Sequence, residues 1–409
     1  MSRFSSYGTA RAALADAVAR AVADAFGVPP PKVELERPAN PAHGDYSTTV
    51  AFDLAKSLRR APREIAGRIA ETIVLPAGIA AAKVEGGGYV NFRLDRAAFV
   101  TAFFSPEAES PAADLGGKVI IEHTNINPNK AAHIGHLRNA ILGDTLVRCL
   151  RAAGTPVEVQ NYIDDTGVQV ADVVVGFWDF RGWTLDQIRA AIEDPKMAGE
   201  YRAFGDLCWE VYAEVGRRYA DDVSTKGLRQ ETLHAMEEGG NARSEAAAMI
   251  SAAIVREHVS TMARLGIAYD LLPRESDILA KHFWSRAFAL LKEKGAIVLE
   301  TEGKHAGCWV MKLTHTEEFA GLEEPDKILV RSNGTVTYTG KDIAYQLWKF
   351  GKLGLDFDYA RFAPDWSAAR GHEDAIPPEI RGRTVWQTAT GVEGDHPRFG
   401  GADRVINVI

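Results

Sequence analysis

The stretch Ile120–Asp144 decides the fold of this chain, and it reads IIEHTNINPNKAAHIGHLRNAILGD. A short apolar run ends before a polar turn at Asn125–Lys130, and a helical pattern begins close to His133. Apolar residues then recur at helical spacing: Ile134, Leu137, Ile141, Leu142 and Leu146. The stretch therefore predicts a strand, a loop and a helix, with two histidines one turn apart where the helix starts.

The start of this helix is suited to binding phosphate. A helix N-terminus offers unpaired backbone N–H groups and the positive end of the helix dipole. Gly135 is an unusual residue there, because glycine costs roughly 1 kcal/mol relative to alanine inside a helix. Its bare Cα would let a phosphate or a flat ring approach the backbone. Alternatively, His133 and His136 only cap and pack the helix.

The composition indicates a globular protein of two to four domains. The chain has 409 residues, of which 46% are hydrophobic and 25% charged. No apolar run approaches the roughly 18 residues that cross a membrane. The three cysteines lie far apart and lack metal-ligand spacing, as in a reducing compartment. We therefore expect a cytoplasmic protein without membrane contact.

The net charge of −8 is unevenly distributed. Residues 1–96 carry thirteen Lys and Arg against ten Asp and Glu, a balance of +3, which leaves −11 for the remainder. A basic module joined to an acidic body is compatible with RNA contact at one end. The candidate phosphate ligands lie near the end of a predicted helix and in the loop after it: Lys56, Arg59, Arg60 and Arg63. Alternatively, they form a solvated charged face.

A second strand is predicted at 155–163, followed by a helix that opens at Asp164 and ends at Phe177. Strand, helix and strand of this length form a parallel crossover, and ligands bind such sheets at the carboxyl ends of the strands. Asp164 and Asp165 could line a substrate pocket, or Asp165 could cap the helix.

The second half of the chain begins with a helical region, 178–268, in which no pattern demands chemistry. We expect the sheet to resume at Lys327–Arg331, with a further strand at Val336–Tyr338 and a helix from Asp342. Tyr338 and Asp342 then lie at a strand-to-helix boundary, where their alternative roles are core packing and N-capping. The final run, 404–409, has the pattern of a buried strand.

Three of these segments resemble arginyl-tRNA synthetases. Residues 127–144, preceded by Glu122, are similar to the signature of class I aminoacyl-tRNA synthetases. Residues 43–70 resemble the additional N-terminal domain of the arginyl enzymes, which contacts the elbow of the tRNA. Residues 330–345 resemble the arginine-binding segment of that family, with Lys341 in place of its usual arginine.

This resemblance implies an α/β fold: the Rossmann-like parallel sheet of class I synthetases, a helical and β connective insertion, and an α+β N-terminal domain. The implied parts are an N-terminal tRNA-contacting domain, two halves of the catalytic domain, and the insertion between those halves. The N-terminal domain is expected at 1–110. The catalytic halves are expected at 118–177 and 325–409, and the insertion at 178–320. We expect the chain to be truncated before the family's KMSK-like loop and anticodon-binding domain.

The function implied by the resemblance is that of an arginine–tRNA ligase. Such an enzyme activates L-arginine with ATP and passes the arginyl group to the 2′-hydroxyl of tRNA(Arg). The matching positions for ATP are His133, Gly135 and His136, with His133, His136 and Lys130 as catalytic residues. The matching positions for arginine are Glu122, Asn127, Tyr338 and Asp342, and Asp342 is expected to meet the guanidinium.

The resemblance further implies that Mg²⁺ accompanies ATP, that the chain holds no metal of its own, and that it is a monomer. Two other functions stay open. One is an RNA-binding fragment without turnover, which would keep the N-terminal module. The other is a nucleotidyltransferase with an HxGH motif that acts on a small molecule, but the N-terminal module and the Tyr338–Asp342 segment argue against it.

Overall fold

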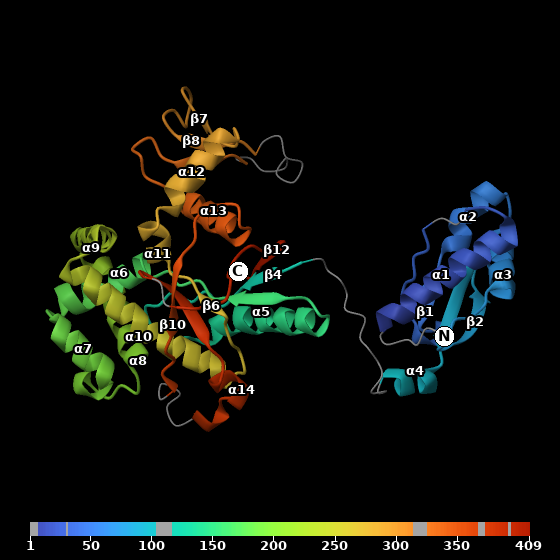
Figure 1. Ribbon diagram of the computed structural model, residues 1–409, viewed down its shortest axis with the longest axis horizontal. Helices are drawn as coiled ribbons and strands as arrows, with labels where there is room; N and C mark the ends of the chain where they lie inside the picture. The colour runs from blue at the N-terminus through green and yellow to red at the C-terminus, as the bar shows by residue number, and fades with distance from the viewer. Residues whose placement is uncertain (1–6, 30–31, 104–116, 314–324, 367–372, 392–393) are drawn as a thin grey trace. The chain divides into compact units, whose positions relative to one another are not determined.

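The computed structural model describes residues 7–29, 32–103, 117–313, 325–366, 373–391 and 394–409 (Figure 1). The chain divides into two compact units, Met1–Ala113 and Asp114–Ile409. Each unit has its own hydrophobic core. Within the described residues, no helix is both long enough and apolar enough to cross a membrane.

The first unit is an α+β module on a three-stranded antiparallel sheet of order β1-β3-β2. Its strands are β1 (Tyr46–Thr48), β2 (Ile79–Glu85) and β3 (Tyr89–Leu94), and its helices are α1 (Tyr7–Phe26), α2 (Val50–Leu58), α3 (Pro62–Thr72) and α4 (Arg96–Phe103). Pro62 suits the first position of α3, where its missing N–H has no partner to lose. Leu14, Ile65 and Phe92 are fully buried between the helices and the sheet.

The second unit is built on a six-stranded sheet of order β10-β11-β6-β5-β4-β12 (Figure 1). Its strands are β4 (Val119–Glu122), β5 (Val157–Gln160), β6 (Leu271–Leu272), β10 (Asp358–Phe362), β11 (Val385–Ala389) and β12 (Arg404–Asn407). All neighbouring pairs are parallel except β10 with β11 at one edge. The predicted Rossmann-like parallel sheet is therefore present.

The order of the strands reverses at β4. From β4 the chain adds β5, β6 and later β11 on one side, whereas β12 pairs with β4 on the other side. Ligands of open α/β sheets bind beside such a switch point, at the carboxyl ends of the strands. Glu122 and Asn407 are paired there as the last residues of β4 and β12.

The helix that follows β4, α5 (Ile134–Ala152), packs on the sheet through small residues. Ala140, Gly143 and Val147 are buried, and a Cβ at Gly143 would lie only 2.2 Å from the ring of His123. Three of the five apolar positions predicted to face the core are instead exposed: Ile134, Ile141 and Leu142. Close approach of the backbone to the strand, which only small residues allow, decides which face is buried.

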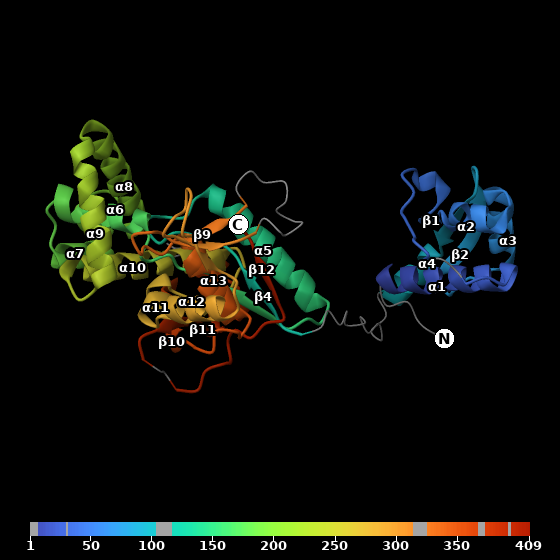
Figure 2. The ribbon, with the colours of Figure 1, turned by 90° about the horizontal axis from the view of Figure 1, so that it is seen from above.

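Five helices between β5 and β6 form a bundle (Figure 2): α6 (Val168–Val175), α7 (Leu185–Glu193), α8 (Phe204–Asp221), α9 (Lys226–Glu238) and α10 (Ala242–Arg264). The bundle has a core of its own, which includes Phe177 and Leu207. The last part of α10 also enters the core of the sheet, where Val259 packs with residues of β4 and β5. The bundle is thereby fixed to the sheet that carries the candidate site.

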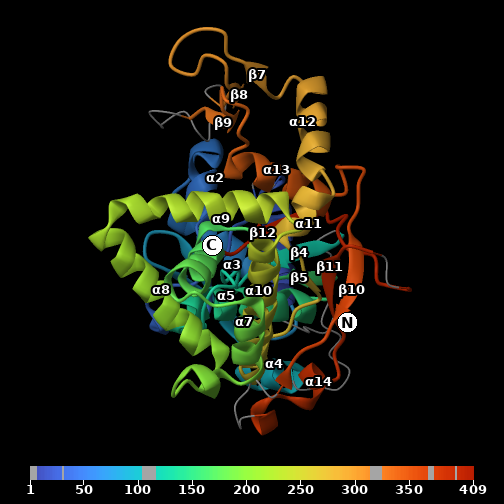
Figure 3. The same ribbon diagram turned by 90° about the vertical axis from the view of Figure 1, so that its left-hand side faces the viewer.

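The segment between β6 and β10 holds α11 (Glu275–Ala280), α12 (Phe283–Glu293), β7 (Val298–Leu299), β8 (Trp309–Met311), β9 (Lys327–Val330) and α13 (Tyr338–Lys349). Strands β7, β8 and β9 form a separate antiparallel sheet (Figure 3). A short helix, α14 (Pro378–Arg381), precedes β11.

Three sequence predictions of strands are wrong in detail. The main sheet resumes at Leu271–Leu272, while Lys327–Val330 belongs to the separate sheet. Two residues carry too little pattern to show which sheet a strand joins. The expected strand at Val336–Tyr338 reduces to one bridge at Val336, because α13 already begins at Tyr338. The final strand is a half-buried edge strand rather than a buried one. The four domain ranges stay a prediction.

Candidate active site

The two histidines of the signature cap α5 reciprocally. His133 is the N-cap, and its Nδ1 accepts a hydrogen bond of 3.1 Å from the backbone N–H of Gly135. The backbone N–H of His133 in turn donates to Nδ1 of His136 at 3.2 Å. The two rings stack with centroids 3.7 Å apart. The alternative considered from the sequence, a capping role, is thus part of the arrangement.

Because Nδ1 of each ring is used in capping, Nε2 is the nitrogen that remains to contact a ligand. Since Nδ1 accepts, the proton of a neutral ring must sit on Nε2, which becomes a hydrogen-bond donor. Burial, together with the nearby charges of His133 and Lys130, lowers the pKa of His136 to about 4. His136 is therefore a neutral donor near pH 7. An N–H group at a helix N-terminus suits an anionic oxygen.

The structure gives a second physical reason why residue 135 is a glycine. A Cβ at this position would lie 2.9 Å from Cε1 and 3.0 Å from Nδ1 of His133, closer than side chains normally approach. The space above the glycine is therefore filled by the imidazole of His133. Glycine at this position is therefore required by the capping geometry itself.

The helical bundle holds Lys130, the third candidate on this side. The ammonium of Lys130 lies 4.8 Å from the ring centroid of Tyr212 and 5.4 Å from that of Trp209, within cation–π distance. Trp209 also meets His133 edge to face, with centroids 5.7 Å apart. His258 of α10 donates from Nε2 to the carbonyl oxygen of Lys130 at 2.8 Å. The sequence predicted no functional residue in the helical bundle, because its side chains meet Lys130 only through contacts between elements far apart in the chain.

Glu122, at the end of β4, is neutralised by a buried lysine that the sequence did not reveal. The ammonium of Lys349 lies 2.6 Å from Oε2 of Glu122 and 3.1 Å from Oδ1 of Asn407, and Lys349 is fully buried. Asn125 donates from Nδ2 to the other oxygen of Glu122 at 3.0 Å. Lys349 thereby ties α13 to both strands at the switch point.

Asp342 lies two helical turns before Lys349 on α13, so the two share one face of the helix. The residue is exposed, but partial burial of its carboxyl group raises the pKa of Asp342, and the negative charges of Glu122 and Glu275 raise it further. Within the described residues, no hydrogen bond or ion pair engages this carboxyl group. Among the described residues, it is therefore a carboxylate without a hydrogen-bonded partner, although the charges of Lys349 and Lys341 act on it from nearby.

The acidic pair after β5 takes two different environments. Asp165 accepts from the backbone N–H and the hydroxyl of Ser276, at 3.0 and 2.7 Å, and Gly167 rather than Asp165 is the N-cap of α6. Burial, and then the hydrogen bond and charge of Glu275, raise the pKa of Asp164. Glu275, missed as a site residue, also accepts from Lys341 at 3.2 Å.

These groups form one acidic cluster at the carboxyl ends of β4 and β5. Its carboxyl groups are Glu122, Asp164, Glu275 and Asp342, and its ammonium groups are Lys341 and Lys349. The raised pKa of Asp164, about 8, favours its protonated form near pH 7, so three carboxylates face two ammonium groups and the balance is still negative. The cluster gathers at the ends of β5, β4 and β12, and the N–H donors of α5 follow β4 in the chain. Such an arrangement can bind a cationic group and an anionic group side by side.

Two of the residues predicted to bind arginine are less well defined in the structure. Asn127 is half-buried, and its carbonyl oxygen accepts from the backbone N–H of Asn129 at 2.8 Å. Tyr338 is the first residue of α13, and its side chain lies outside the described residues. The turn just before Asn127 is strained, because Thr124 and Asn125 adopt φ values of 77° and 47°, in the left-handed region. Strain of this kind gathers at functional sites.

The four basic candidates of the first unit lie around the turn between α2 and α3, and all are exposed: Lys56, Arg59, Arg60 and Arg63. Arg60 pairs with Glu64 at 3.3 Å, and Arg63 donates to the carbonyl oxygen of Gly86 at 3.3 Å. Within the described residues, the side chains of Lys56 and Arg59 have no such partner. These two are therefore the better available ligands for a phosphate.

Comparison with known proteins decides the family. Residues 11–94 match the model of the arginyl tRNA synthetase N terminal domain, and residues 100–358 match that of the class I (R) tRNA synthetase catalytic domain. The second match alone covers more than half of the chain. The chain belongs to the arginyl-tRNA synthetase family. The resemblance to arginyl-tRNA synthetases is thereby confirmed, as is the class I α/β fold.

Similar members of the arginyl-tRNA synthetase family come from bacteria and archaea. The arginine–tRNA ligase of Thermococcus sibiricus is 37% identical over 92% of this chain and 57% of its own length. That of Deinococcus radiodurans is 38% identical over 94% of this chain and 56% of its own. The Thermus thermophilus arginyl-tRNA synthetase structure has a TM-score of 0.72 and 33% identity, over 97% of this chain and 59% of that one. The chain thus spans a little over half the length of these relatives.

Proposed function

We propose that this chain carries out the chemistry of an arginine–tRNA ligase: ATP-dependent activation of L-arginine, and transfer of the arginyl group to the 2′-hydroxyl of tRNA(Arg). The observation that carries the proposal is the carboxylate of Asp342, which makes no hydrogen bond or ion pair within the described residues, in a net acidic cluster at the strand end that leads to α5. A guanidinium is a planar cation with five donors, for which carboxylates are the natural partners.

In the first step, the carboxylate of arginine attacks the α-phosphorus of ATP, and pyrophosphate leaves. Negative charge develops on the phosphate oxygens, so positioned donors contribute more than a nucleophile would. Nε2–H of His133 and His136 would donate to those oxygens, and Lys130 would add a point charge. We further propose that ATP enters together with Mg²⁺ and that the chain acts as a cytoplasmic monomer.

In the second step, the 2′-hydroxyl of the terminal ribose attacks the carbonyl carbon of arginyl-adenylate, and AMP leaves. Within the substrate, Asp342 would hold the guanidinium, while Glu122 and Asn127 would address the α-amino end. Because Lys349 already compensates Glu122, we assign Glu122 a hydrogen-bonding role rather than that of a full counter-charge. Tyr338 keeps its assignment at the arginine pocket through the family match alone.

The sharpest test compares L-arginine with L-citrulline, a ligand of nearly the same shape without the charge. We expect calorimetry to detect arginine binding and citrulline binding at least about 30-fold weaker, as for one lost buried charge pair. Arginine-dependent ATP–pyrophosphate exchange then tests turnover. If the two ligands bind with equal affinity, or if neither binds, the proposal is contradicted. Arginine and tRNA binding without exchange would favour the catalytically incomplete alternative.

His136→Ala should lower the rate of arginine activation about 10²-fold, as for the loss of one donor to a transition-state oxyanion. Arginine affinity should stay within about twofold, because His136 faces the phosphate side. The measurement is pyrophosphate exchange at saturating arginine. The matched control is His234→Ala on α9, remote in sequence from the signature, for which we expect an unchanged rate. Full exchange by His136→Ala would refute the assignment.

The exposed basic turn of the first unit predicts the salt dependence of tRNA binding. Lys56→Gln combined with Arg59→Gln should weaken tRNA(Arg) binding. The slope of log association constant against log salt concentration should become less steep by about 1.4–1.8, because each lost phosphate contact removes about 0.7–0.9. The control is Arg68→Gln, an exposed residue of α3 paired with Glu71. Unchanged slopes in the double variant would place the tRNA elsewhere.

A further inference from the structure

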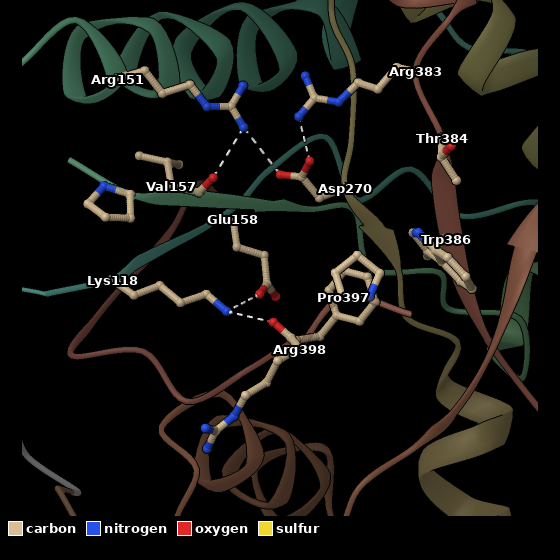
Figure 4. A pocket seen from close by; sticks show the side chains of 12 residues that line it. Lys118, Arg151, Val157, Glu158, Asp270, Arg383, Thr384, Trp386, Pro397 and Arg398 are labelled. Carbon is tan, nitrogen blue, oxygen red and sulfur yellow. Dashed lines mark hydrogen bonds and ion pairs between the residues drawn. The ribbon is translucent and has the colours of Figure 1, made fainter. Parts of the chain in front are cut away.

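A cavity of ≈ 570 Å³ opens at the amino edge of the main sheet (Figure 4). Its lining includes the residues that immediately precede four strands: Lys118 before β4, Pro156 before β5, Asp270 before β6 and Thr384 before β11. The acidic cluster and the start of α5 lie at the opposite, carboxyl edge. Since β4 spans four residues, roughly 10 Å of strand separates the two edges. The cavity is thus distinct from the candidate active site.

Two guanidinium groups converge on one carboxylate at this cavity (Figure 4). Arg151 donates to Asp270 at 3.2 Å, and Arg383 donates to the other oxygen of the same carboxylate. Two positive charges against one negative charge leave one positive charge uncompensated. Burial and the neighbouring charge of Arg383 lower the pKa of Arg151, whereas Asp270 acts in the opposite direction.

Most N–H groups of the two arginines make no hydrogen bond to the part of the chain that the structure describes. Arg151 uses a single nitrogen, shared between Asp270 and the carbonyl oxygen of Val157 at 3.2 Å. Within the described residues, Arg383 likewise uses a single nitrogen, toward Asp270. A guanidinium carries five N–H groups on three nitrogens. The pair can therefore offer several donors to one more anion.

The rest of the lining contains one ion pair, apolar groups and a third arginine, Arg398, whose guanidinium points away from Asp270 (Figure 4). Lys118 pairs with Glu158 at 2.5 Å and also donates to the carbonyl oxygen of Gly400, so its charge is already used. The apolar part of the lining comes from Pro156, Trp386 and Pro397. Figure 4 shows Trp386 and Pro397 on the side of the cavity away from Lys118. Apolar walls with a few convergent donors are typical of sites for small organic ligands.

We propose that this cavity binds a small organic phosphate, with its phosphate group on Arg151 and Arg383 and a flat apolar body against Trp386 and the two prolines. Arginine pairs bind phosphate oxygens through parallel N–H bonds, and phosphate supplies the missing negative charge. The inference is independent of the arginine chemistry, because none of these residues belongs to the candidate active site.

Phenyl phosphate is a suitable probe, because it joins a phosphate to a flat ring. A ligand-observed NMR titration of the 409-residue chain should give one saturable site with Kd on the order of 1 mM, the range for a ligand of about ten heavy atoms. Phenol, which lacks the phosphate, and inorganic phosphate, which lacks the ring, should each bind at least about tenfold more weakly. Saturable binding of phenyl phosphate no tighter than that of both fragments would contradict the proposal.

Arg383→Gln locates the binding, because glutamine can still donate to Asp270 while the charge is lost. We expect this variant to weaken phenyl phosphate binding about tenfold or more, and Arg151→Gln to do the same. The control is Arg264→Gln, an exposed arginine of α10 away from the cavity lining, for which affinity should be unchanged. Absence of saturable binding, or equal affinity in the Arg383→Gln variant and the control, would overturn the proposal.

Discussion

Asp342→Asn should weaken arginine binding about 300-fold, the middle of the roughly 2–5 kcal/mol range for removing one partner of a buried charge pair. The amide keeps the size of the carboxyl group and loses its charge, so the packing of α13 stays intact. ATP affinity should not change, because Asp342 belongs to the acidic cluster rather than to the start of α5. Calorimetry with each ligand separately measures both effects.

Two controls sharpen this prediction. Asp186→Asn removes a carboxylate of the helical bundle, 90% exposed in its side chain, and should leave arginine affinity unchanged. Citrulline should bind the wild-type chain and Asp342→Asn equally weakly, because neither combination contains the ion pair. Asp342→Asn with wild-type arginine affinity would show that another group meets the guanidinium.

The pH dependence of arginine binding follows from the same carboxylate. Burial and the neighbouring charges of Glu122 and Glu275 raise the pKa of Asp342 in the free protein. The ionised form, which we propose as the partner of the guanidinium, exists above this pKa and is lost as pH falls through it. Arginine affinity should therefore begin to fall at a higher pH than for an ordinary aspartate. Asp342→Asn should bind arginine weakly without that fall.

Lys349→Met should destabilise the second unit by about 3–5 kcal/mol, the typical penalty for removing one partner of a buried ion pair. Methionine fills most of the volume, but it leaves the carboxylate of Glu122 and the amide oxygen of Asn407 without the ammonium that they share. All eight tryptophans lie in this unit, at 178 and beyond. Tryptophan fluorescence during urea unfolding therefore reports on this unit alone.

Two variants separate the ion pair from a general effect of the substitution. Lys352→Met changes an exposed lysine just after the same helix, and we expect an effect below about 0.5 kcal/mol. Glu122→Gln combined with Lys349→Met removes both charges and should be more stable than Lys349→Met alone. If Lys349→Met is as stable as Lys352→Met, the buried pair does not hold α13 to the sheet.

The sequence predicted those parts of the site that are encoded locally. The helix after β4 and its two histidines follow from a continuous stretch with helical periodicity. Asp342 was predicted from the family resemblance, because no local sequence pattern marks its position on α13. The exposed basic turn of the first unit was also visible, because it is compact in sequence.

What the sequence missed depends on contacts over long distances. Lys349 meets Glu122 across 227 positions, and a lone lysine in a helix gives no sign of burial. Trp209 and Tyr212 reach Lys130 only because α8 folds back on the loop before α5. The place of the two-residue strand β6 in the main sheet is defined by its pairing with β5 and β11 rather than by its own composition.

We propose that the acidic cluster and the start of α5 are two halves of one binding cleft. The most direct measurement is a crystal structure of the chain with L-arginine and a non-hydrolysable ATP analogue. We expect the guanidinium within about 3 Å of the Asp342 carboxylate, at hydrogen-bond distance, and the phosphates at His133 and His136. A guanidinium bound away from Asp342, or phosphates bound away from α5, would contradict the account.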